Sequence, residues 1–113
     1  MKISQKQKNE IQVIELSGEL DFQSSPELRD RLQKIIEEFN KVLVNLKKVS
    51  YIDSSGLATF VEALQKVKRT NGKLVLSELA PAVRSVFEIA KLDRVFSLAT
   101  SEEEGFQLLQ TTE

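Results

Sequence analysis

The sequence predicts an α/β fold in which a central, mostly parallel β-sheet is covered by about four helices. Short apolar segments alternate with amphipathic segments along the chain, and one nearly continuous apolar run, residues 42–46, has the pattern of a strand buried on both faces. The length of 113 residues suits one hydrophobic core. Because strands that alternate with helices favour parallel pairing with right-handed connections, we expect the order ββαβαβαβα and a single domain over residues 1–113.

Composition narrows the classes of function. Lys and Arg together number 16 against 17 Asp and Glu, which gives a net charge of −1. This balance argues against a nucleic-acid partner, which requires clustered surplus cations, and against a polybasic membrane-surface protein. The chain contains no Cys and no His, so the usual ligands of zinc and the histidine of a Ser-His-Asp mechanism are both missing. We expect a protein that is not an enzyme and that binds no cofactor or metal.

The first residues predict an antiparallel pair of strands. Apolar residues between positions 11 and 17 indicate a strand, and the charged stretch over residues 2–7 suits an exposed edge strand that turns around residues 8–10. The start of the chain lacks the apolar stretch of a signal peptide, and no apolar run approaches the ~20 residues that span a bilayer. We therefore expect a cytoplasmic protein without membrane insertion.

Residues 24–39 predict the first helix. Ser24 or Ser25 can accept a hydrogen bond from an amide group at the helix start, and Pro26 suits the first turn. The apolar residues that recur on one helical face are Leu28, Leu32, Ile35, Ile36 and Phe39.

The remaining elements continue the alternation. A second helix follows the motif at residues 53–56 and ends at Asn71-Gly72, since both residues tolerate the left-handed conformation. A strand over residues 74–76, a third helix from Pro81 and a strand over residues 95–98 come next. The inner face of the third helix is expected to contain Val83, Val86, Phe87 and Ala90. Ser101 and Glu104 have the spacing of a capping box for a terminal helix.

The loop before the second helix is the strongest candidate site. Binding sites of open α/β sheets gather where strands lead into helix N-termini, and Asp53-Ser54-Ser55-Gly56 brings two hydroxyl groups to such a junction. Amide groups there lack intrahelical partners and the helix dipole favours negative charge, so a phosphate on a serine would meet hydrogen-bond donors. From the local physics alone, helix capping by these Asp and Ser residues is the stronger explanation.

Two motifs in a fixed order resemble the STAS domain family, and within it the bacterial anti-sigma factor antagonists, or anti-anti-sigma factors. The first is GELD at residues 18–21, and the second is VSYIDSSGL at residues 49–57, after the buried strand. The similarity continues through residues 71–73 and 80–83, so it covers nearly the whole chain. Ala58 departs from the pattern, because many members have a second glycine there.

The resemblance implies a regulator that is switched by phosphorylation. Such a protein binds an anti-sigma factor and thereby frees the sigma factor for transcription. The anti-sigma factor is also a serine kinase that phosphorylates the antagonist and releases it, and a metal-dependent serine phosphatase resets the switch. Ser54 matches the phosphorylated residue. The expected partner-binding residues are Asp21, Ser24, Asp53, Ser54, Ser55, Gly56 and Leu57, to which we add Phe22 as an exposed aromatic contact.

Two other interpretations stay open. The chain could be a STAS-type accessory subunit of an ATP-driven, lipid-exporting transport complex, in which the domain braces the ATPase. It could also use the same switch for an output other than a sigma factor, such as motility or biofilm control. Phosphate on Ser54 that abolishes partner binding would support the switch, whereas stable co-purification with an ATPase and membrane subunits would support the transport interpretation.

Overall fold

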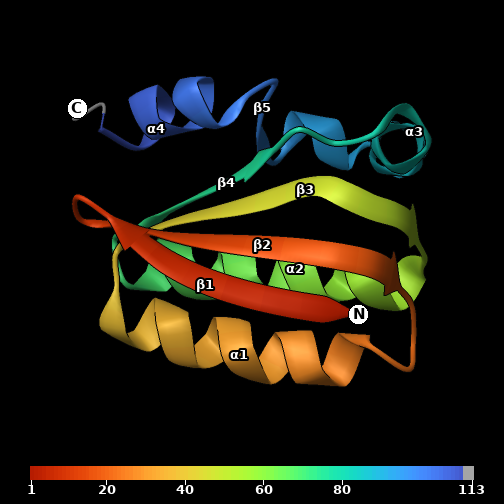
Figure 1. The fold of residues 1–113 in the computed structure, drawn as a ribbon, viewed down its shortest axis with the longest axis horizontal. Helices are drawn as coiled ribbons and strands as arrows, with labels where there is room; N and C mark the ends of the chain where they lie inside the picture. Colours follow the sequence, from red (N-terminus) through yellow and green to blue (C-terminus); the bar gives the residue numbers. More distant parts are fainter. Residues whose placement is uncertain (111–113) are drawn as a thin grey trace.

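A five-stranded sheet forms the centre of the computed structural model, which describes residues 1–110 (Figure 1). The strands lie side by side in the order in which they occur along the chain. They are β1 (Lys2–Lys8), β2 (Ile11–Leu20), β3 (Lys41–Ile52), β4 (Lys73–Ser77) and β5 (Ser97–Ala99). β1 pairs antiparallel with β2, and every other neighbouring pair is parallel.

Within residues 1–110, four α-helices connect or follow these strands. They are α1 (Ser25–Glu38), α2 (Ser54–Arg69), α3 (Pro81–Ile89) and α4 (Glu102–Gln110), and a short 3-10 turn, η1 (Leu92–Arg94), precedes β5. The predicted fold class and the predicted order ββαβαβαβα are confirmed.

The sheet is covered unequally on its two faces. Each parallel strand is added on the same side of the previous one, so right-handed connections bring α1, α2 and α3 to one face. On that face β3 buries Val42, Val44 and Leu46 in the larger apolar core. On the other face Leu43 belongs to a smaller core, to which α4 contributes Leu109. The run of residues 42–46 is therefore buried on both sides, as its composition predicts.

Three phenylalanines pack together and connect α2 and α3 with the segment that precedes β5. The ring centroids of Phe60 and Phe87 are 6.3 Å apart, and those of Phe87 and Phe96 are 5.6 Å apart in a T-shaped arrangement. All three side chains are buried. Burial of each such side chain stabilises the fold by about 1.5–3 kcal/mol.

Two predicted boundaries near the C-terminus are wrong. The last strand covers residues 97–99 rather than 95–98, because η1 occupies the preceding residues and leaves Val95 52% exposed. Ala90 does not belong to the inner face of α3, since the helix ends at Ile89 and Lys91 adopts the left-handed conformation with φ 62°. Apolar periodicity alone does not reveal where such a turn interrupts a helix.

The residues predicted to end α2 and to begin α4 take these roles in part. After α2 it is Asn71 that takes the left-handed conformation, at φ 61°, while the amide of Gly72 donates to the Val67 carbonyl oxygen at 2.7 Å. At the start of α4 the Ser101 hydroxyl accepts a hydrogen bond from the Glu104 amide at 3.1 Å, as predicted. The Glu104 carboxylate, however, accepts from the Thr100 amide at 2.6 Å, one residue before its partner in a capping box.

Candidate functional site

Two loops meet beyond the C-terminal ends of β2 and β3, on the right-hand side of Figure 1. β2 ends at Leu20 before α1, and β3 ends at Ile52 before α2. Because these strands are parallel neighbours, their C-terminal loops emerge together. The Asp53 amide donates a hydrogen bond to the Leu20 carbonyl oxygen at 3.1 Å and so joins the two loops directly.

The Asp53 carboxylate caps α2. Its Oδ1 atom accepts hydrogen bonds from the amides of Ser55 at 2.9 Å and Gly56 at 3.2 Å. It also accepts from the Ser55 hydroxyl at 2.6 Å. The Ser55 hydroxyl above all, together with the backbone amides of Gly56, Ser55 and Phe22, holds the pKa of Asp53 below its ordinary value of 3.8. Asp53 is therefore ionised at neutral pH.

The Ser55 hydroxyl is occupied within the protein. It donates its single proton to Asp53, so in its 3.1 Å contact with the hydroxyl of Ser25 it acts as the acceptor. Ser25 is 2% exposed, and its hydroxyl donates a hydrogen bond to the carbonyl oxygen of Asp21 at 2.7 Å. These contacts join the first residues of α1 to the first turn of α2.

The Ser54 hydroxyl has a different environment. Ser54 is the first residue of α2 and its side chain is exposed. Among the hydrogen bonds described for residues 1–110, none involves its hydroxyl group. Of the two adjacent serines, Ser54 is thus the one that a second protein can reach without breaking an existing contact.

One expectation about this helix start needs correction. A phosphate on Ser54 was expected to find amide donors in place, but Asp53 already accepts from the amides of Ser55 and Gly56. The Leu57 amide is also occupied, because it donates to the Asp53 carbonyl oxygen at 3.0 Å. A phosphate here would meet a carboxylate rather than vacant amides, and the two like charges would repel.

Gly56 allows the close approach of α2 to the two strand ends. A Cβ atom at this position would lie 2.7 Å from Leu20 Cγ and 2.8 Å from Ile52 Cγ1. The following residue, Leu57, is half-buried against the larger core and half accessible beside Ser54. Glycine is required here for packing, which the sequence motif indicates only as a preference.

The β2–α1 loop is stabilised by Asp21 and Ser24. Oδ1 of Asp21 accepts from the amides of Gln23 at 3.0 Å and Ser24 at 3.1 Å. The Ser24 hydroxyl accepts from the Asp21 amide at 3.0 Å and donates to the Glu19 carbonyl oxygen at 2.9 Å. Ser24 occupies the N-cap position of α1, but its hydroxyl makes no cap hydrogen bond to the helix. The predicted side-chain cap is therefore wrong, because the Ser24 hydroxyl bonds within the loop and the Ser25 hydroxyl contacts Asp21 and Ser55.

An exposed aromatic and an acidic hollow border this loop. Phe22 is 72% exposed, as expected of a residue between two polar neighbours. Tyr51, which lies opposite Glu19 in the β2–β3 register, is 50% exposed and was not among the predicted site residues. Its only sequence signal is its position within the second motif, residues 49–57. A hollow of about 340 Å³ beside the loop is lined by Met1, Glu19, Asp21, Gln23, Ser24 and Glu27.

The predicted site residues come together on these two loops. Asp21, Phe22 and Ser24 belong to the first, and residues 53–57 form the end of the second and the first turn of α2. Within residues 1–110, no three Asp or Glu residues are grouped closely enough to hold a metal ion. In the same part of the chain, no helix has the length and apolar character needed to cross a membrane.

Comparison with known proteins identifies the family of this chain. Residues 2–105 match the model of the STAS domain. The chain belongs to the STAS domain family. This STAS domain is 36% identical over 99 residues to the anti-sigma-B factor antagonist of Bacillus subtilis, an alignment that covers 88% of the chain and 90% of that relative.

Solved structures share the fold of this STAS domain. The anti-sigma factor antagonist SpoIIAA in its unphosphorylated form matches with a TM-score of 0.75 and 20% identity over 98% of this chain and 100% of that chain. Bacillus SpoIIAA in its phosphorylated form matches with a TM-score of 0.73 and 24% identity over 95% of this chain and 99% of that chain. At these identities the similarity establishes the fold alone.

Proposed function

We propose that this STAS domain is an anti-sigma factor antagonist whose partner-binding surface is formed by the two loops, and that phosphorylation of Ser54 releases the partner. The observation that carries the proposal is the contrast between neighbouring serines: Ser54 is exposed at the start of α2, whereas Ser55 is bound to Asp53 and Ser25. The relative from Bacillus subtilis, named an anti-sigma-B factor antagonist, supports the assignment of the partner class.

The modification is a phosphoryl transfer from ATP supplied by the partner, an anti-sigma factor that is also a serine kinase. The Ser54 hydroxyl oxygen forms a bond to the γ-phosphorus, and the bond from that phosphorus to the bridging oxygen of ATP breaks. ADP leaves with the bonding electron pair, and the serine proton passes to a base of the kinase. A metal-dependent serine phosphatase restores the hydroxyl by hydrolysis to inorganic phosphate.

The added charge provides the switch. Phosphoserine carries about −1.5 to −2 charges at pH 7, and here it would stand beside the ionised Asp53. Both the exposed Phe22 and the half-accessible Leu57 give the docking surface an apolar component. Docking would therefore require desolvation of a dianion next to apolar contacts. A penalty of a few kcal/mol is sufficient, because each 1.4 kcal/mol lowers the affinity tenfold.

This switch needs no change of fold. The chain matches the unphosphorylated and the phosphorylated forms of SpoIIAA with similar TM-scores, 0.75 and 0.73. In addition, Ser54 can gain a phosphate without loss of any hydrogen bond described for its side chain. We therefore expect amide NMR shifts to change only around Ser54 and Asp21, and widespread changes would contradict a purely electrostatic and steric switch.

The deciding experiment combines a candidate anti-sigma factor kinase with ATP, the full chain and mass spectrometry of the product. We expect one phosphate, on Ser54, and loss of the complex in a pull-down after the reaction. A phosphate on Ser55 would overturn the site assignment. A chain that is never phosphorylated but co-purifies with an ATPase and membrane subunits would support the transport-complex interpretation instead.

A further inference from the structure

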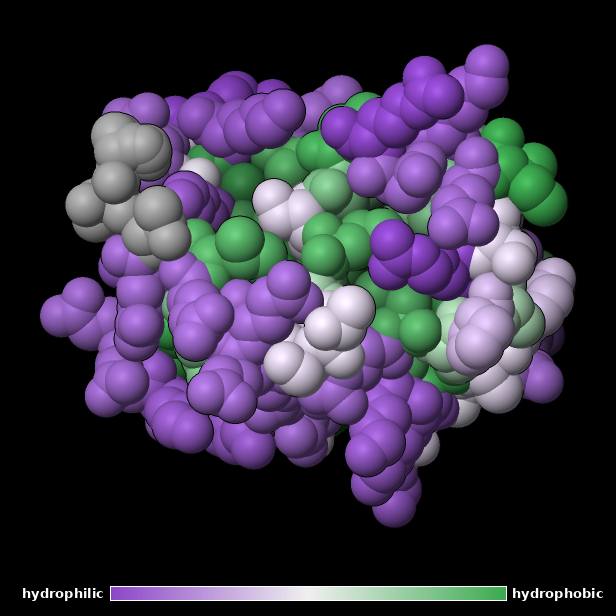
Figure 2. Space-filling model, turned by 90° about the horizontal axis from the view of Figure 1, so that it is seen from above, coloured by the Kyte–Doolittle hydropathy of each residue, from purple (hydrophilic) through white to green (hydrophobic). Residues whose placement is uncertain are grey.

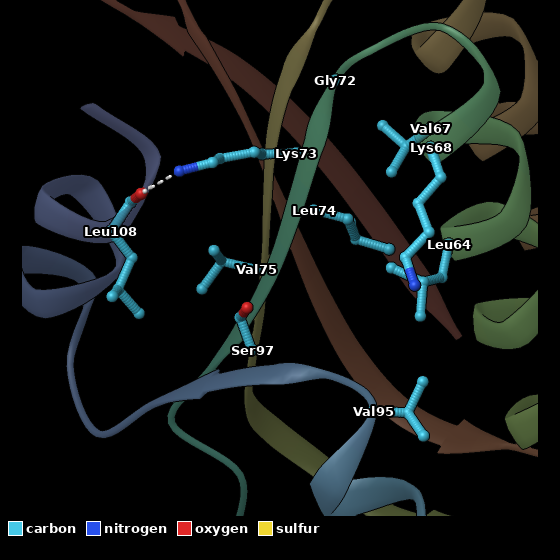
Figure 3. A pocket seen from close by; sticks show the side chains of 10 residues that line it. All are labelled: Leu64, Val67, Lys68, Gly72, Lys73, Leu74, Val75, Val95, Ser97 and Leu108. Carbon is cyan, nitrogen blue, oxygen red and sulfur yellow. Dashed lines mark hydrogen bonds between the residues drawn. The ribbon is translucent and has the colours of Figure 1, made fainter. Parts of the chain in front are cut away.

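Two hollows contain no residue of the two candidate-site loops, and they differ in chemistry. The first is a groove of about 260 Å³ between α2 and α4 (Figure 3). It is lined mainly by aliphatic side chains, and Lys73 Nζ bridges β4 to α4 by donating to the Leu108 carbonyl oxygen at 3.2 Å. Figure 2, which views the molecule from the side of α3 and α4, shows hydrophobic surface across the middle of this face. The second hollow, on the sheet itself, is lined mostly by polar and charged residues.

This second hollow lies on a part of the sheet that no described helix covers. On the same face α4 packs against the first residues of β2 and β3. In Figure 1 the later part of β2 and the adjoining part of β1 face the viewer with no helix in front of them. The hollow has a volume of about 540 Å³, which is within the range of small-molecule sites. Its polar and charged lining residues are Lys2, Ser4, Glu15, Ser17 and Lys48.

Three of these residues form one row across neighbouring strands. Lys2 is the antiparallel partner of Ser17, and Ser17 is the parallel partner of Lys48. Paired residues of neighbouring strands point to the same face of a sheet, and all three line the hollow. Because neighbouring strands lie about 4.8 Å apart, the Cα atoms of the two lysines are about 10 Å from each other with the serine between them. An anion above Ser17 is therefore within reach of both ammonium groups.

The charged and hydroxyl groups of the hollow are available to a ligand. Neither Lys2 nor Lys48 takes part in an ion pair described for residues 1–110. The carboxylate in the lining, that of Glu15, is paired with Lys6 Nζ at 3.4 Å. The hydroxyls of the two lining serines take part in none of the side-chain hydrogen bonds described for the same residues. Two ammonium groups and two hydroxyls can thus bind a ligand without loss of an existing contact.

The position of Lys48 differs from that of an ordinary surface lysine on a sheet. Lysines on an outer strand hinder edge-to-edge aggregation, and this role is sufficient to explain those of β1. Lys48 belongs to β3, which is the middle strand of the sheet and has no free edge. Binding of an anion gives Lys48 a role that edge protection does not.

We propose that this hollow binds a small phosphorylated polyol, with the phosphate dianion above Ser17 between the ammonium groups of Lys2 and Lys48. Two positive charges match a dianion, and the Ser17 hydroxyl can donate to a phosphate oxygen. The hydroxyl groups of the ligand face the next row, where Ser4 and Glu15 are register partners and the carboxylate accepts from them. The two rows are about 6.6 Å apart along the strands, which is comparable with the length of glycerol phosphate. The site goes beyond the proposed function, since it shares no residue with the two loops.

The test is a titration of the ¹⁵N-labelled full chain with glycerol phosphate, followed by amide NMR shifts at constant ionic strength in a buffer free of phosphate. We expect shifts at Ser17 and Lys48 that saturate, with half-saturation below about 5 mM. Glycerol alone should cause no shifts, and inorganic phosphate should bind several-fold more weakly because it lacks the hydroxyl contacts. Shifts that rise without saturation, or an affinity for inorganic phosphate equal to or higher than that for glycerol phosphate, would overturn the proposal.

A matched pair of lysine variants locates the site. Lys48→Gln should weaken binding of glycerol phosphate by about fivefold or more, because one of the two charge-assisted contacts is lost. Lys47→Gln should not, since this neighbouring lysine is exposed on the same strand but does not line the hollow. Both positions are exposed, so both variants should fold, which their amide spectra check. Equal losses of affinity in the two variants would overturn the site.

A phosphate of this kind can belong to a soluble compound or to a lipid headgroup. Sedimentation of the chain with vesicles of phosphatidylcholine and phosphatidic acid distinguishes the two sources, and we expect the chain to stay in solution. Co-sedimentation that is lost in Lys48→Gln and kept in Lys47→Gln would overturn the soluble ligand in favour of a lipid headgroup. Co-sedimentation that the two variants change equally would overturn the site itself.

Discussion

The hydroxyl oxygens of Ser25 and Ser55 lie 3.1 Å apart, although 30 residues separate them in the sequence. This contact joins the start of α1 to the start of α2 and belongs to a chain of hydrogen bonds that ends at the Asp53 carboxylate. It fixes one serine of the Ser54-Ser55 pair within the protein and leaves the other at the surface. The effects expected of Ser54→Ala and Ser55→Ala follow from this difference.

Ser54→Ala should abolish phosphorylation and leave the fold intact. The side chain makes no hydrogen bond described in the structure, so the free energy of unfolding should change by less than about 1 kcal/mol. The variant should bind the anti-sigma factor kinase and remain bound in the presence of ATP. Urea unfolding and a pull-down with ATP measure the two effects, and release of the variant by ATP would contradict the assignment.

Ser55→Ala should instead lower the stability of the fold and leave phosphorylation intact. It removes the hydrogen bonds to Asp53 and Ser25, so we expect it to destabilise the protein by about 1–3 kcal/mol while phosphorylation of Ser54 continues. Ser25→Ala and the double variant complete a thermodynamic cycle measured by urea unfolding. A coupling energy near zero would show that the contact between the two hydroxyls contributes nothing.

Gly56→Ala should destabilise the protein through crowding. The new methyl group would lie within 3 Å of Leu20 Cγ and Ile52 Cγ1, and such overpacking costs about 1–3 kcal/mol. Ala58→Ser, at an exposed position of the same helix, serves as the control and should change the stability by less than about 0.5 kcal/mol. A stability for Gly56→Ala equal to that of the control would mean that α2 can move away from the strand ends without cost.

A fall in pH should lower the free energy of unfolding of the wild type more than that of Asp53→Asn. The folded pKa of Asp53 is lowered, so its contribution to stability is fully present above its ordinary value of 3.8 and is lost as the pH falls through the lower folded pKa. Asparagine still caps a helix but does not titrate. Unfolding measured from pH 6 down to pH 3 should show a smaller loss for Asp53→Asn. Parallel curves would contradict the lowered pKa.

Phe22→Ala should affect binding without affecting stability. The side chain is 72% exposed, so its removal should change the free energy of unfolding by less than about 0.5 kcal/mol. Affinity for the anti-sigma factor should fall by about tenfold or more, as for an aromatic anchor of an interface. Calorimetry of the complex measures this effect, with Val95→Ala as a control outside the two loops. An unchanged affinity would remove Phe22 from the binding surface.

The sequence by itself determined the order of the elements and the place of the candidate site. Burial of one or two faces of an element requires apolar residues at a regular spacing along the chain. This spacing can be read from the sequence for residues 42–46, for α1 and for α2. The resemblance of residues 18–21 and 49–57 to the STAS domain family likewise needed no coordinates, and it directed attention to Ser54.

Only the tertiary structure decided how the two adjacent serines differ and where a groove forms between α2 and α4. Ser54 and Ser55 are identical in type, and only the fold brings Ser25 and Asp53 to one of them. The groove depends on β5 being three residues long while α2 and α4 extend past it. Such features arise from contacts between distant segments, and these contacts leave no periodic signal in a single sequence.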